Sequence, residues 1–389
     1  MRTERNHIDL PTLLAVLVLM VLSLGVVYSA SSTWAMLKSG SSEKLLGSHA
    51  LKVLLGFAMI FLFTNVDYKK YKKLTKPILV GTVIVLLVTL ALGGEVKGAT
   101  RWLRFDGFGL QPSEFAKYAL IFHLCVLLSE KRDRIRDFRT GFIPMMIWIA
   151  TVTVLVLLQP NFSNGAMIFA ISLIMLFIGR AKLSHIGLTF ASLVPLLVLY
   201  MFSAEYRMKR IMSFFNESAD SGGQANYQLW QGIIGFGNGG LFGLGPGQSR
   251  QRELFLPESY GDFVFSIVGE EYGLIGTLVI LLLFLTILLR GMKIAKNARD
   301  DFGRYLAIGI TTSIALYALV NAGVTLGILP TTGLPMPFVS YGGSAMLFSS
   351  IAVGVLLNVS SQTDMHPRLP RGAGMVRPLE PTPAVGKVY

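Results

Sequence analysis

Long apolar stretches separated by polar intervals dominate this chain. A helix needs about 20 mainly apolar residues to cross a bilayer, and ten stretches approach or reach that length. They cover residues 10–31, 45–66, 74–93, 113–129, 141–159, 164–179, 183–203, 263–289, 305–328 and 340–359. The pattern therefore predicts an all-α polytopic membrane protein with ten transmembrane helices. The longest polar interval, residues 204–262, lies between helices seven and eight.

The composition agrees with this class of protein. Hydrophobic residues make up 52% of the chain and charged residues only 15%, against roughly 25% charged in an ordinary soluble domain. Cys125 is the only cysteine, which excludes a disulfide framework and a thiolate metal cluster. The five histidines are scattered, with no pair at a ligand spacing, so we predict no histidine metal site.

Lysine and arginine residues predict the orientation, because cytoplasmic loops are enriched in them. Of the 35, 23 lie in alternate intervals or in the tail, 11 lie on the other side, and Lys52 lies inside a span. The basic intervals are residues 2–5, 69–76, 131–139, 180–182, 290–304 and 368–387. Both termini are then cytoplasmic. The net charge of +13 is interpreted as a topology signal and an attraction to anionic membrane lipid, not as nucleic-acid binding.

Three segments follow from this topology. Residues 1–9 form a cytoplasmic N-terminus, residues 10–360 form one ten-helix membrane domain that includes the large extracytoplasmic loop 204–262, and residues 361–389 form a cytoplasmic tail. The end of the tail holds five prolines and little apolar content, which predicts disorder. We interpret the first stretch as an uncleaved anchor, because it is long for a signal peptide.

The unusual polar residues fall on the predicted outer side. Ser113 is placed to cap the start of the fourth helix, and Glu114 and Lys117 are three residues apart, so they share a helix face. Lys117 lies one turn inside the bilayer edge, where a charge is costly and needs a partner. Two interpretations stay open: a Glu114–Lys117 ion pair that anchors the helix, or a cation that holds an anionic headgroup.

Acidic residues mark the start of the eighth helix. Asp262 stands where the long loop turns into this helix, so it is either a cap favoured by the helix dipole or a general base beside basic residues such as Arg101 and Arg104. Glu270 and Glu271 are adjacent within an apolar run. Two interpretations of this pair stay open: a structural role, in which the carboxyl groups make buried hydrogen bonds, or a functional role.

Two segments are rich in glycine or proline. Residues 235–247 resemble a phosphate-binding loop but lack the lysine and hydroxyl of the P-loop pattern, and we interpret them as a flexible interfacial loop. Residues 330–343 form a turn-rich segment that either lines a cavity or simply connects two helices. The chain carries no nucleotide-binding motif, so a reaction would need an activated substrate.

Five ordered motifs resemble those of the SEDS family (shape, elongation, division, sporulation), whose main branches are FtsW and RodA. They are Arg101-Trp102, Gln111–Lys117 (QPSEFAK), Leu256–Phe263 (LPESYGDF), Gly269–Glu271 (GEE) and Pro337–Gly343 (PFVSYGG). The resemblance covers roughly residues 10–360.

The resemblance implies a peptidoglycan glycosyltransferase that polymerises lipid II at the outer face of the bacterial cytoplasmic membrane. The implied partners are lipid II, the growing glycan, a class B penicillin-binding protein with transpeptidase activity, and divisome or elongasome proteins. The implied transfer is inverting: an acceptor hydroxyl attacks the donor sugar, and undecaprenyl diphosphate leaves. A divalent cation, Mg²⁺ or Mn²⁺, would be an additional helper, although the sequence shows no dedicated ligand cage.

The resemblance also implies roles for single residues. It makes Asp262 the general base. We expect the substrate-binding residues to be Arg101, Gln111, Glu114, Lys117, Glu258, Ser340, Gly342 and Gly343, and the supporting residues to be Arg104, Glu270 and Glu271. Two positions depart from the family pattern. Asn161 replaces an aspartate found in many members, so no acid–base role carries over there, and Gly261 replaces the usual threonine before Asp262.

The branch and the reaction have alternatives. Tyr28–Ser31, residues 161–163 and residues 245–250 look more like the division branch, whereas residues 333–337 also suit the elongation branch, and we favour an FtsW-like protein. A lipid II flippase and a non-catalytic scaffold for the transpeptidase are the other functions considered. A carboxylate at the outer rim favours chemistry, because moving a headgroup requires cations more than a base.

Overall fold

The computed structural model describes residues 7–92, 94–96, 99–105, 108–132, 134–202, 208, 223–257 and 259–365. The helices are α1 (Leu10–Ser39), α2 (Lys44–Asn65), α3 (Tyr71–Leu92), α4 (Pro112–Glu130), α5 (Ile143–Leu158), α6 (Phe162–Ile178), α7 (Leu183–Phe202), α9 (Gly223–Gly239), α10 (Val264–Lys296), α11 (Asp301–Thr325) and α12 (Gly343–Ser361). Short helical turns are η1 (Tyr68–Lys70), η2 (Phe138–Phe142) and η3 (Gln251–Phe255). Strands β1 (Gly94–Val96), β2 (Ala99–Phe105) and β3 (Phe108–Leu110) form an antiparallel sheet in that order.

The predicted apolar stretches are mainly helical in the described residues. Each of the ten coincides with one helix, from α1 to α7 and from α10 to α12. Within the described residues, seven helices are long and apolar enough to cross a membrane: α1, α2, α3, α5 with η2, α10, α11 and α12. The fold is therefore that of a polytopic helical membrane protein.

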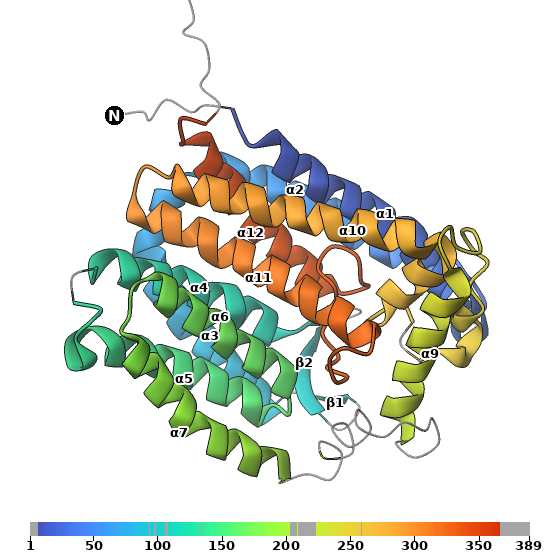
Figure 1. The fold of residues 1–389 in the computed structure, drawn as a ribbon, viewed down its shortest axis with the longest axis horizontal. Helices are drawn as coiled ribbons and strands as arrows, with labels where there is room; N and C mark the ends of the chain where they lie inside the picture. Colours follow the sequence, from blue (N-terminus) through green and yellow to red (C-terminus); the bar gives the residue numbers. More distant parts are fainter. Residues whose placement is uncertain are drawn as a thin grey trace, which may run out of the picture.

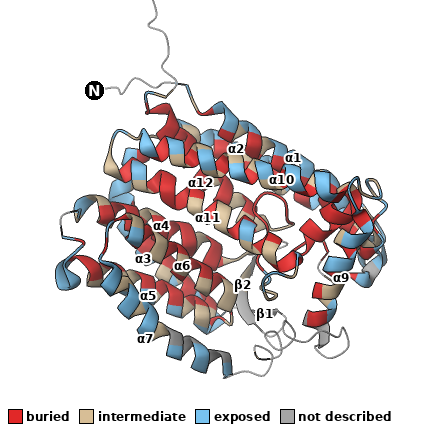
Figure 2. Ribbon diagram, viewed as in Figure 1, coloured by how far each residue is buried: buried red, intermediate tan, exposed pale blue. Residues whose placement is uncertain are grey.

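The helices pack with the most buried ones in the centre. Most residues of α4, α11 and α12 are buried (Figure 2). Helices α1, α2, α3 and α10 lie around them and expose large apolar side chains, such as Phe61 and Leu282. Exposed apolar faces of this extent suit a lipid environment better than water. Helix α7 lies at the edge beside α6 (Figure 1).

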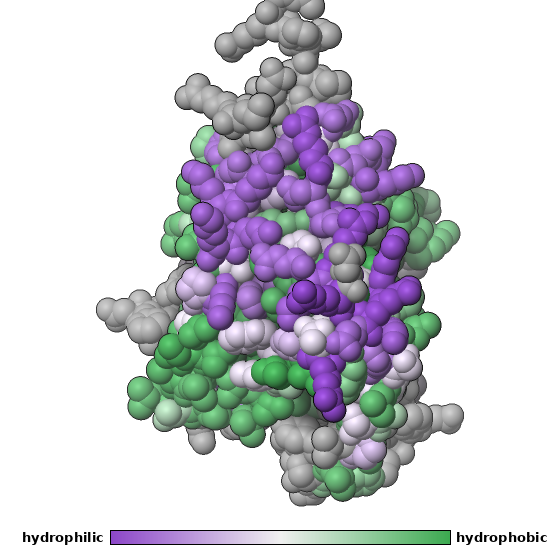
Figure 3. All heavy atoms as spheres, turned by 90° about the vertical axis from the view of Figure 1, so that its left-hand side faces the viewer, coloured by the Kyte–Doolittle hydropathy of each residue, from purple (hydrophilic) through white to green (hydrophobic). Residues whose placement is uncertain are grey.

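The bundle has two ends of different character. We call the end at the left of Figure 1 the basic end, where α1, α3, α5 and α11 begin and α2, α4, α10 and α12 finish. It exposes the lysine and arginine side chains of residues 69–76, 132–139, 180–182 and 293–304, and Figure 3 shows its hydrophilic surface. The opposite end carries β1–β3 and α9, and we call it the sheet end.

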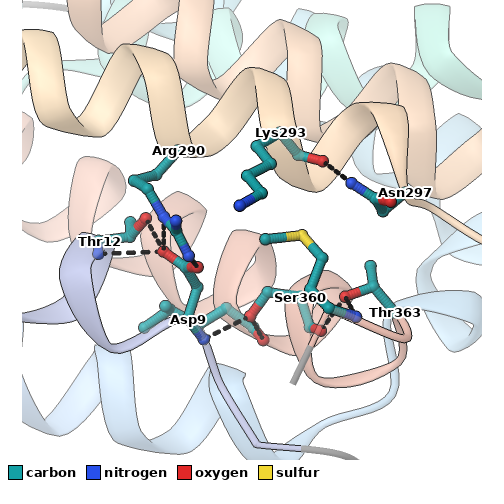
Figure 4. A network of polar contacts seen from close by, with 9 residues as sticks. Asp9, Thr12, Arg290, Lys293, Asn297, Ser360 and Thr363 are labelled. Carbon is teal, nitrogen blue, oxygen red and sulfur yellow. Dashed lines mark hydrogen bonds and ion pairs between the residues drawn. The ribbon is translucent and has the colours of Figure 1, made fainter. Parts of the chain in front are cut away.

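A polar network joins three helix ends at the basic end (Figure 4). The Asp9 carboxylate, which is fully buried, accepts hydrogen bonds from Arg290 and from the hydroxyl and backbone N–H of Thr12. The backbone N–H of Asp9 donates to the hydroxyl of Ser360 at 3.0 Å. This network ties the first turn of α1 to the last turns of α10 and α12.

Glycine explains why the sequence does not predict α9. Residues 223–239, which the hydropathy pattern leaves in the long loop, are helical, although glycine disfavours helices. A Cβ at Gly239 would collide with the backbone of Gly269, so glycine here allows α9 to approach α10 closely. Residues 235–239 therefore belong to a packed helix and not to a flexible loop.

Helix α10 is broken beside this contact. Gly273 has φ +64° and ψ −161°, outside the helical region, a conformation that glycine adopts without steric cost. The freed backbone groups bond to the segment after α9: Leu244 N–H donates to the Glu270 carbonyl, and Leu274 N–H donates to the Gly240 carbonyl, both at 2.9 Å. The break thus docks residues 240–245 onto α10.

Candidate functional site

The starts of three helices meet at the sheet end around the α11–α12 loop (residues 326–342). The backbone N–H of Tyr341 donates to the carbonyl of Tyr260 at 3.0 Å, which joins the loop to the segment before α10. The hydroxyl of Ser344, in the first turn of α12, accepts from the backbone N–H of Gln111 at 2.8 Å. Motifs more than 200 residues apart in the sequence are thereby held together.

The start of α6 joins the same assembly. The hydroxyl of Ser163 donates to the carbonyl of Thr332 in the α11–α12 loop at 2.6 Å. The side-chain amides of Asn161 and Asn164 donate to the hydroxyl of Ser113, at 3.2 Å and 3.3 Å. Asn161, which replaces the family aspartate, therefore serves as a neutral hydrogen-bond donor to the first turn of α4.

Asp262 lies two residues before α10, against the α11–α12 loop. Its side chain is partly exposed, and its Oδ2 lies 3.2 Å from the position that a Cβ on Gly333 would take. Its backbone carbonyl accepts a hydrogen bond from the amide of Asn321 on α11 at 2.8 Å. The carboxylate is thus set at the sheet end, beside a loop whose glycine leaves room for it.

Glu114 and Lys117 form a buried ion pair in α4. The Nζ–Oε2 distance is 2.8 Å, and the side chains are 1% and 3% exposed, respectively. The ammonium also lies 3.8 Å from the centroid of the Tyr317 ring, and the Tyr317 hydroxyl donates to Asn164 at 2.8 Å. A charge pair at this depth is tolerated only because each charge compensates the other.

This geometry matches the anchoring interpretation of the pair and leaves its binding role as a prediction. The ammonium of Lys117 is occupied by Glu114 and by a tyrosine ring. The second carboxylate oxygen, Oε1 of Glu114, has no hydrogen-bond partner in the described part of the chain. An unpaired buried acceptor is costly, so hydrogen bonding within the described residues satisfies the carboxylate only in part.

Glu270 and Glu271 are buried and hydrogen-bonded. Glu270 accepts from the hydroxyl of Ser249 and from the backbone N–H of Gln251, the latter at 3.1 Å. Glu271 accepts from the hydroxyl of Ser29 on α1. The two carboxylates therefore hold the segment that leads from α9 toward Asp262, and they tie it to α1.

The residues predicted around the start of α12 lie in tight turns. Ser340 is buried, and its hydroxyl accepts from the backbone N–H of Met336 at 2.9 Å. Gly342 precedes the helix in extended conformation, and Gly343 packs against the stem of Lys52, whose Cε lies 3.2 Å from an ideal Cβ position. The glycine at 343 thus admits the lysine stem.

Three predicted residues cannot be placed through their side chains. Glu258 lies outside the described residues. Arg101 and Arg104 lie in strand β2 at the sheet end, and their side chains are likewise outside the described part of the structure. Their roles stay predictions.

Two side chains that the sequence did not assign to the site contact residues of the site. Lys52 on α2 places its ammonium 3.7 Å from the centroid of the Tyr341 ring. The sequence feature that could have identified it is a single charge inside a predicted transmembrane stretch. Asn321 on α11 contacts the backbone of Asp262, and a single asparagine in an apolar run carries no spacing that would have identified it.

The described residues contain no group of three or more histidine, cysteine, aspartate or glutamate side chains that could hold a metal ion.

Comparisons with known proteins agree with the fold and the motifs. Residues 10–365 match a family model described as cell cycle protein, FtsW/RodA/SpoVE. The chain is 39% identical to a probable peptidoglycan glycosyltransferase FtsW of Geobacter metallireducens, over 92% of this chain and 96% of that one. It is also 39% identical to stage V sporulation protein E of Bacillus subtilis, over 92% and 99%.

A solved structure has the same fold. It is a chain of a peptidoglycan synthase complex described as coordinating polymerisation and crosslinking. It superimposes with a TM-score of 0.74 at 22% identity, over 91% of this chain and 97% of that chain.

Proposed function

Because this chain belongs to the FtsW/RodA/SpoVE family of cell cycle proteins, we propose that it is a multi-pass membrane glycosyltransferase that polymerises lipid II into peptidoglycan. The observation that carries the proposal is the placement of Asp262, which stands partly exposed beside the α11–α12 loop, where family motifs meet. The relatives named FtsW favour a role in cell division.

The proposed topology places the basic end in the cytoplasm and the sheet end outside. The exposed lysine and arginine side chains of the basic end support it, because such residues are retained on the cytoplasmic side. All ten predicted helices then span the membrane, both termini are cytoplasmic, and Asp262 faces outward. The membrane is the bacterial cytoplasmic (inner) membrane.

In the proposed reaction, Asp262 acts as the general base. Its carboxylate accepts the proton of the acceptor GlcNAc 4-hydroxyl while that oxygen attacks C1 of the lipid-linked MurNAc. The bond from C1 to the diphosphate oxygen breaks, and undecaprenyl diphosphate leaves with the electron pair. A single displacement inverts the configuration at C1, so the protein needs no covalent nucleophile. The partial exposure of Asp262 leaves the carboxylate accessible to the hydroxyl.

Charge on the leaving diphosphate is proposed to be stabilised by the cationic groups of the sheet end. Lys52 lies beside the start of α12, and Arg101 and Arg104 lie in β2. The positive ends of the α4, α10 and α12 dipoles point toward the same end of the bundle. Oriented donors and dipoles of this kind stabilise developing negative charge without reorganising during the reaction.

The contacts that join α1, α10 and α12 at the basic end favour an enzyme over a flippase. A flippase must open a path for a large polar headgroup to the cytoplasm, yet the network of Asp9, Arg290 and Ser360 joins three helices across this end. A class B transpeptidase is the proposed partner, supported by the structural likeness to a chain of a complex that couples polymerisation to crosslinking.

The test is polymerisation of lipid II by the purified full-length protein together with its cognate transpeptidase. We expect glycan strands from the wild type and none from Asp262→Ala, with Asp137→Asn, an exposed acid at the basic end, as the matched control that keeps activity. No polymer from the wild type would support a scaffold. Normal polymer from Asp262→Ala would refute the base assignment.

A further inference from the structure

We propose that Asn321 is a positioning residue for Asp262, and that its side-chain amide sets where the general base stands against the α11–α12 loop. The proposal rests on the proposed function, since it concerns the geometry of the same reaction. It assigns a role to a side chain that hydrogen-bonds to the backbone carbonyl of Asp262 and therefore acts through that residue.

The contacts of Asn321 are unusually well placed for this role. The side chain is 1% exposed and projects from the last two turns of α11. Its Nδ2 donates one hydrogen to the carbonyl of Asp262 at 2.8 Å and the other to the carbonyl of Leu334 at 2.7 Å. Both amide hydrogens are thereby committed to two segments that belong to the site.

The two carbonyls also fix the orientation of the amide. If the amide were rotated by half a turn, its oxygen would face two carbonyl oxygens, and neither carbonyl would receive a hydrogen bond. In the observed orientation, Oδ1 of Asn321 has no hydrogen-bond partner within the described residues. The position therefore requires a planar group with two donors, which aspartate and leucine of similar size do not provide.

The amide of Asn321 thus holds two segments in place: Asp262, which bears the carboxylate, and the α11–α12 loop, against which the carboxylate packs. Leu334 directly follows Gly333, and Oδ2 of Asp262 lies 3.2 Å from the Cβ position of that glycine. A shift of either segment would move the carboxylate relative to the acceptor hydroxyl. Misplacing a reacting group by about 1 Å can cost roughly 100-fold in rate.

The basic end supplies a matched control, because Asn358 does the same structural work far from the site. It is fully buried in α12, its Nδ2 donates to the carbonyl of Thr64 at 2.8 Å, and its Oδ1 accepts from the backbone N–H of Tyr68 at 2.8 Å. Removing it deletes a buried amide of the same kind without touching Asp262.

The experiment compares Asn321→Leu, Asn321→Asp and Asn358→Leu in the full-length protein with its transpeptidase. Lipid II polymerisation gives kcat and KM, lipid II binding is measured separately, and thermal unfolding gives Tm. Rates are divided by the fraction of protein that binds lipid II, so that misfolded material does not count. We expect kcat of both Asn321 variants to fall roughly 10- to 100-fold with KM and binding little changed, whereas Asn358→Leu lowers Tm and keeps kcat.

Two outcomes overturn the proposal. One is a wild-type kcat in either Asn321 variant that binds lipid II. The other is a loss of kcat in the Asn358 variant as large as in the Asn321 variants. Such a loss would mean that removing any buried amide of the bundle lowers kcat, whether or not it contacts Asp262. Asp262→Ala in the same assay separates this failure from that of the proposed function, since a fully active Asp262→Ala refutes the base itself.

Discussion

The two ends of the bundle use the same kinds of buried polar side chain, but they differ in what these side chains hold in place. At the basic end, both oxygens of Asp9 accept hydrogen bonds, and both amide groups of Asn358 are paired. These contacts hold helix ends together.

The sheet end keeps acceptors and hydroxyls unpaired. Oε1 of Glu114, Oδ1 of Asn321 and the hydroxyls of Thr331 and Thr332 are buried without a hydrogen-bond partner among the described residues. Buried polar groups without a partner also occur at the basic end, where Gln362 Oε1 and the Tyr71 hydroxyl are examples. The two ends therefore differ in what their paired side chains hold in place: helix ends at the basic end, and the segments around Asp262 at the sheet end.

The largest effect should come from breaking the buried ion pair of the sheet end. Lys117→Met leaves the charge of Glu114 buried and unpaired, which should lower the free energy of unfolding by about 3–5 kcal/mol. Chemical unfolding in detergent measures this loss. Adding Glu114→Gln removes the unpaired charge and should recover most of the stability.

The same double variant separates the two interpretations of the Glu114–Lys117 pair. If the pair also binds lipid II, KM for lipid II should stay raised after stability is recovered, and this is the result we expect. A double variant with the KM of the wild type would show that the pair only anchors α4.

A smaller effect is expected at the basic end, where Arg290 is 21% exposed and partly solvated. Asp9→Asn should cost about 1–3 kcal/mol of unfolding free energy, the usual range for unpairing a buried polar group. The kcat of the folded protein should not change, because Asp9 precedes α1 at the basic end, whereas Asp262 precedes α10 at the opposite end. A fall in kcat without a fall in stability would show that the two ends are coupled.

The smallest effect on stability should come from Gly333→Ala. This variant tests how kcat depends on the position of the Asp262 carboxylate. Gly333 and Gly40 have nearly equal positive φ values, +70° and +69°, and a Cβ at Gly40 would meet no atom within 4 Å, so alanine should cost about 1–2 kcal/mol at either position. Only the methyl group at 333 meets Asp262. We expect kcat to fall roughly tenfold, about 1.4 kcal/mol, for Gly333→Ala alone, and equal kcat values for the two variants would contradict this.

The sequence predicted the helices well because apolar run length decides them. All ten stretches are helical, and only ends differ, as in α1, which continues to Ser39. The sheet of residues 94–110 and helix α9 were missed, since their polar and glycine-rich segments carry no apolar period. Close backbone contacts such as Gly239 against Gly269 stabilise α9, and such tertiary contacts are invisible to local propensity.

The site was predictable where spacing carries the information. The three-residue interval between Glu114 and Lys117 predicted a shared face, and the structure shows the pair in contact. Asn321 had no such signal, because its partners are carbonyl groups of residues 262 and 334, which only the folded chain brings together.

The most direct test of the central claim is the single-turnover rate of Asp262→Asn at saturating lipid II, with lipid II binding measured on the same preparation. Asparagine keeps the shape of the side chain but cannot accept the proton. The account predicts unchanged binding and a rate lowered by about 10²- to 10⁴-fold, the range for loss of a general base. A rate equal to that of the wild type would contradict it.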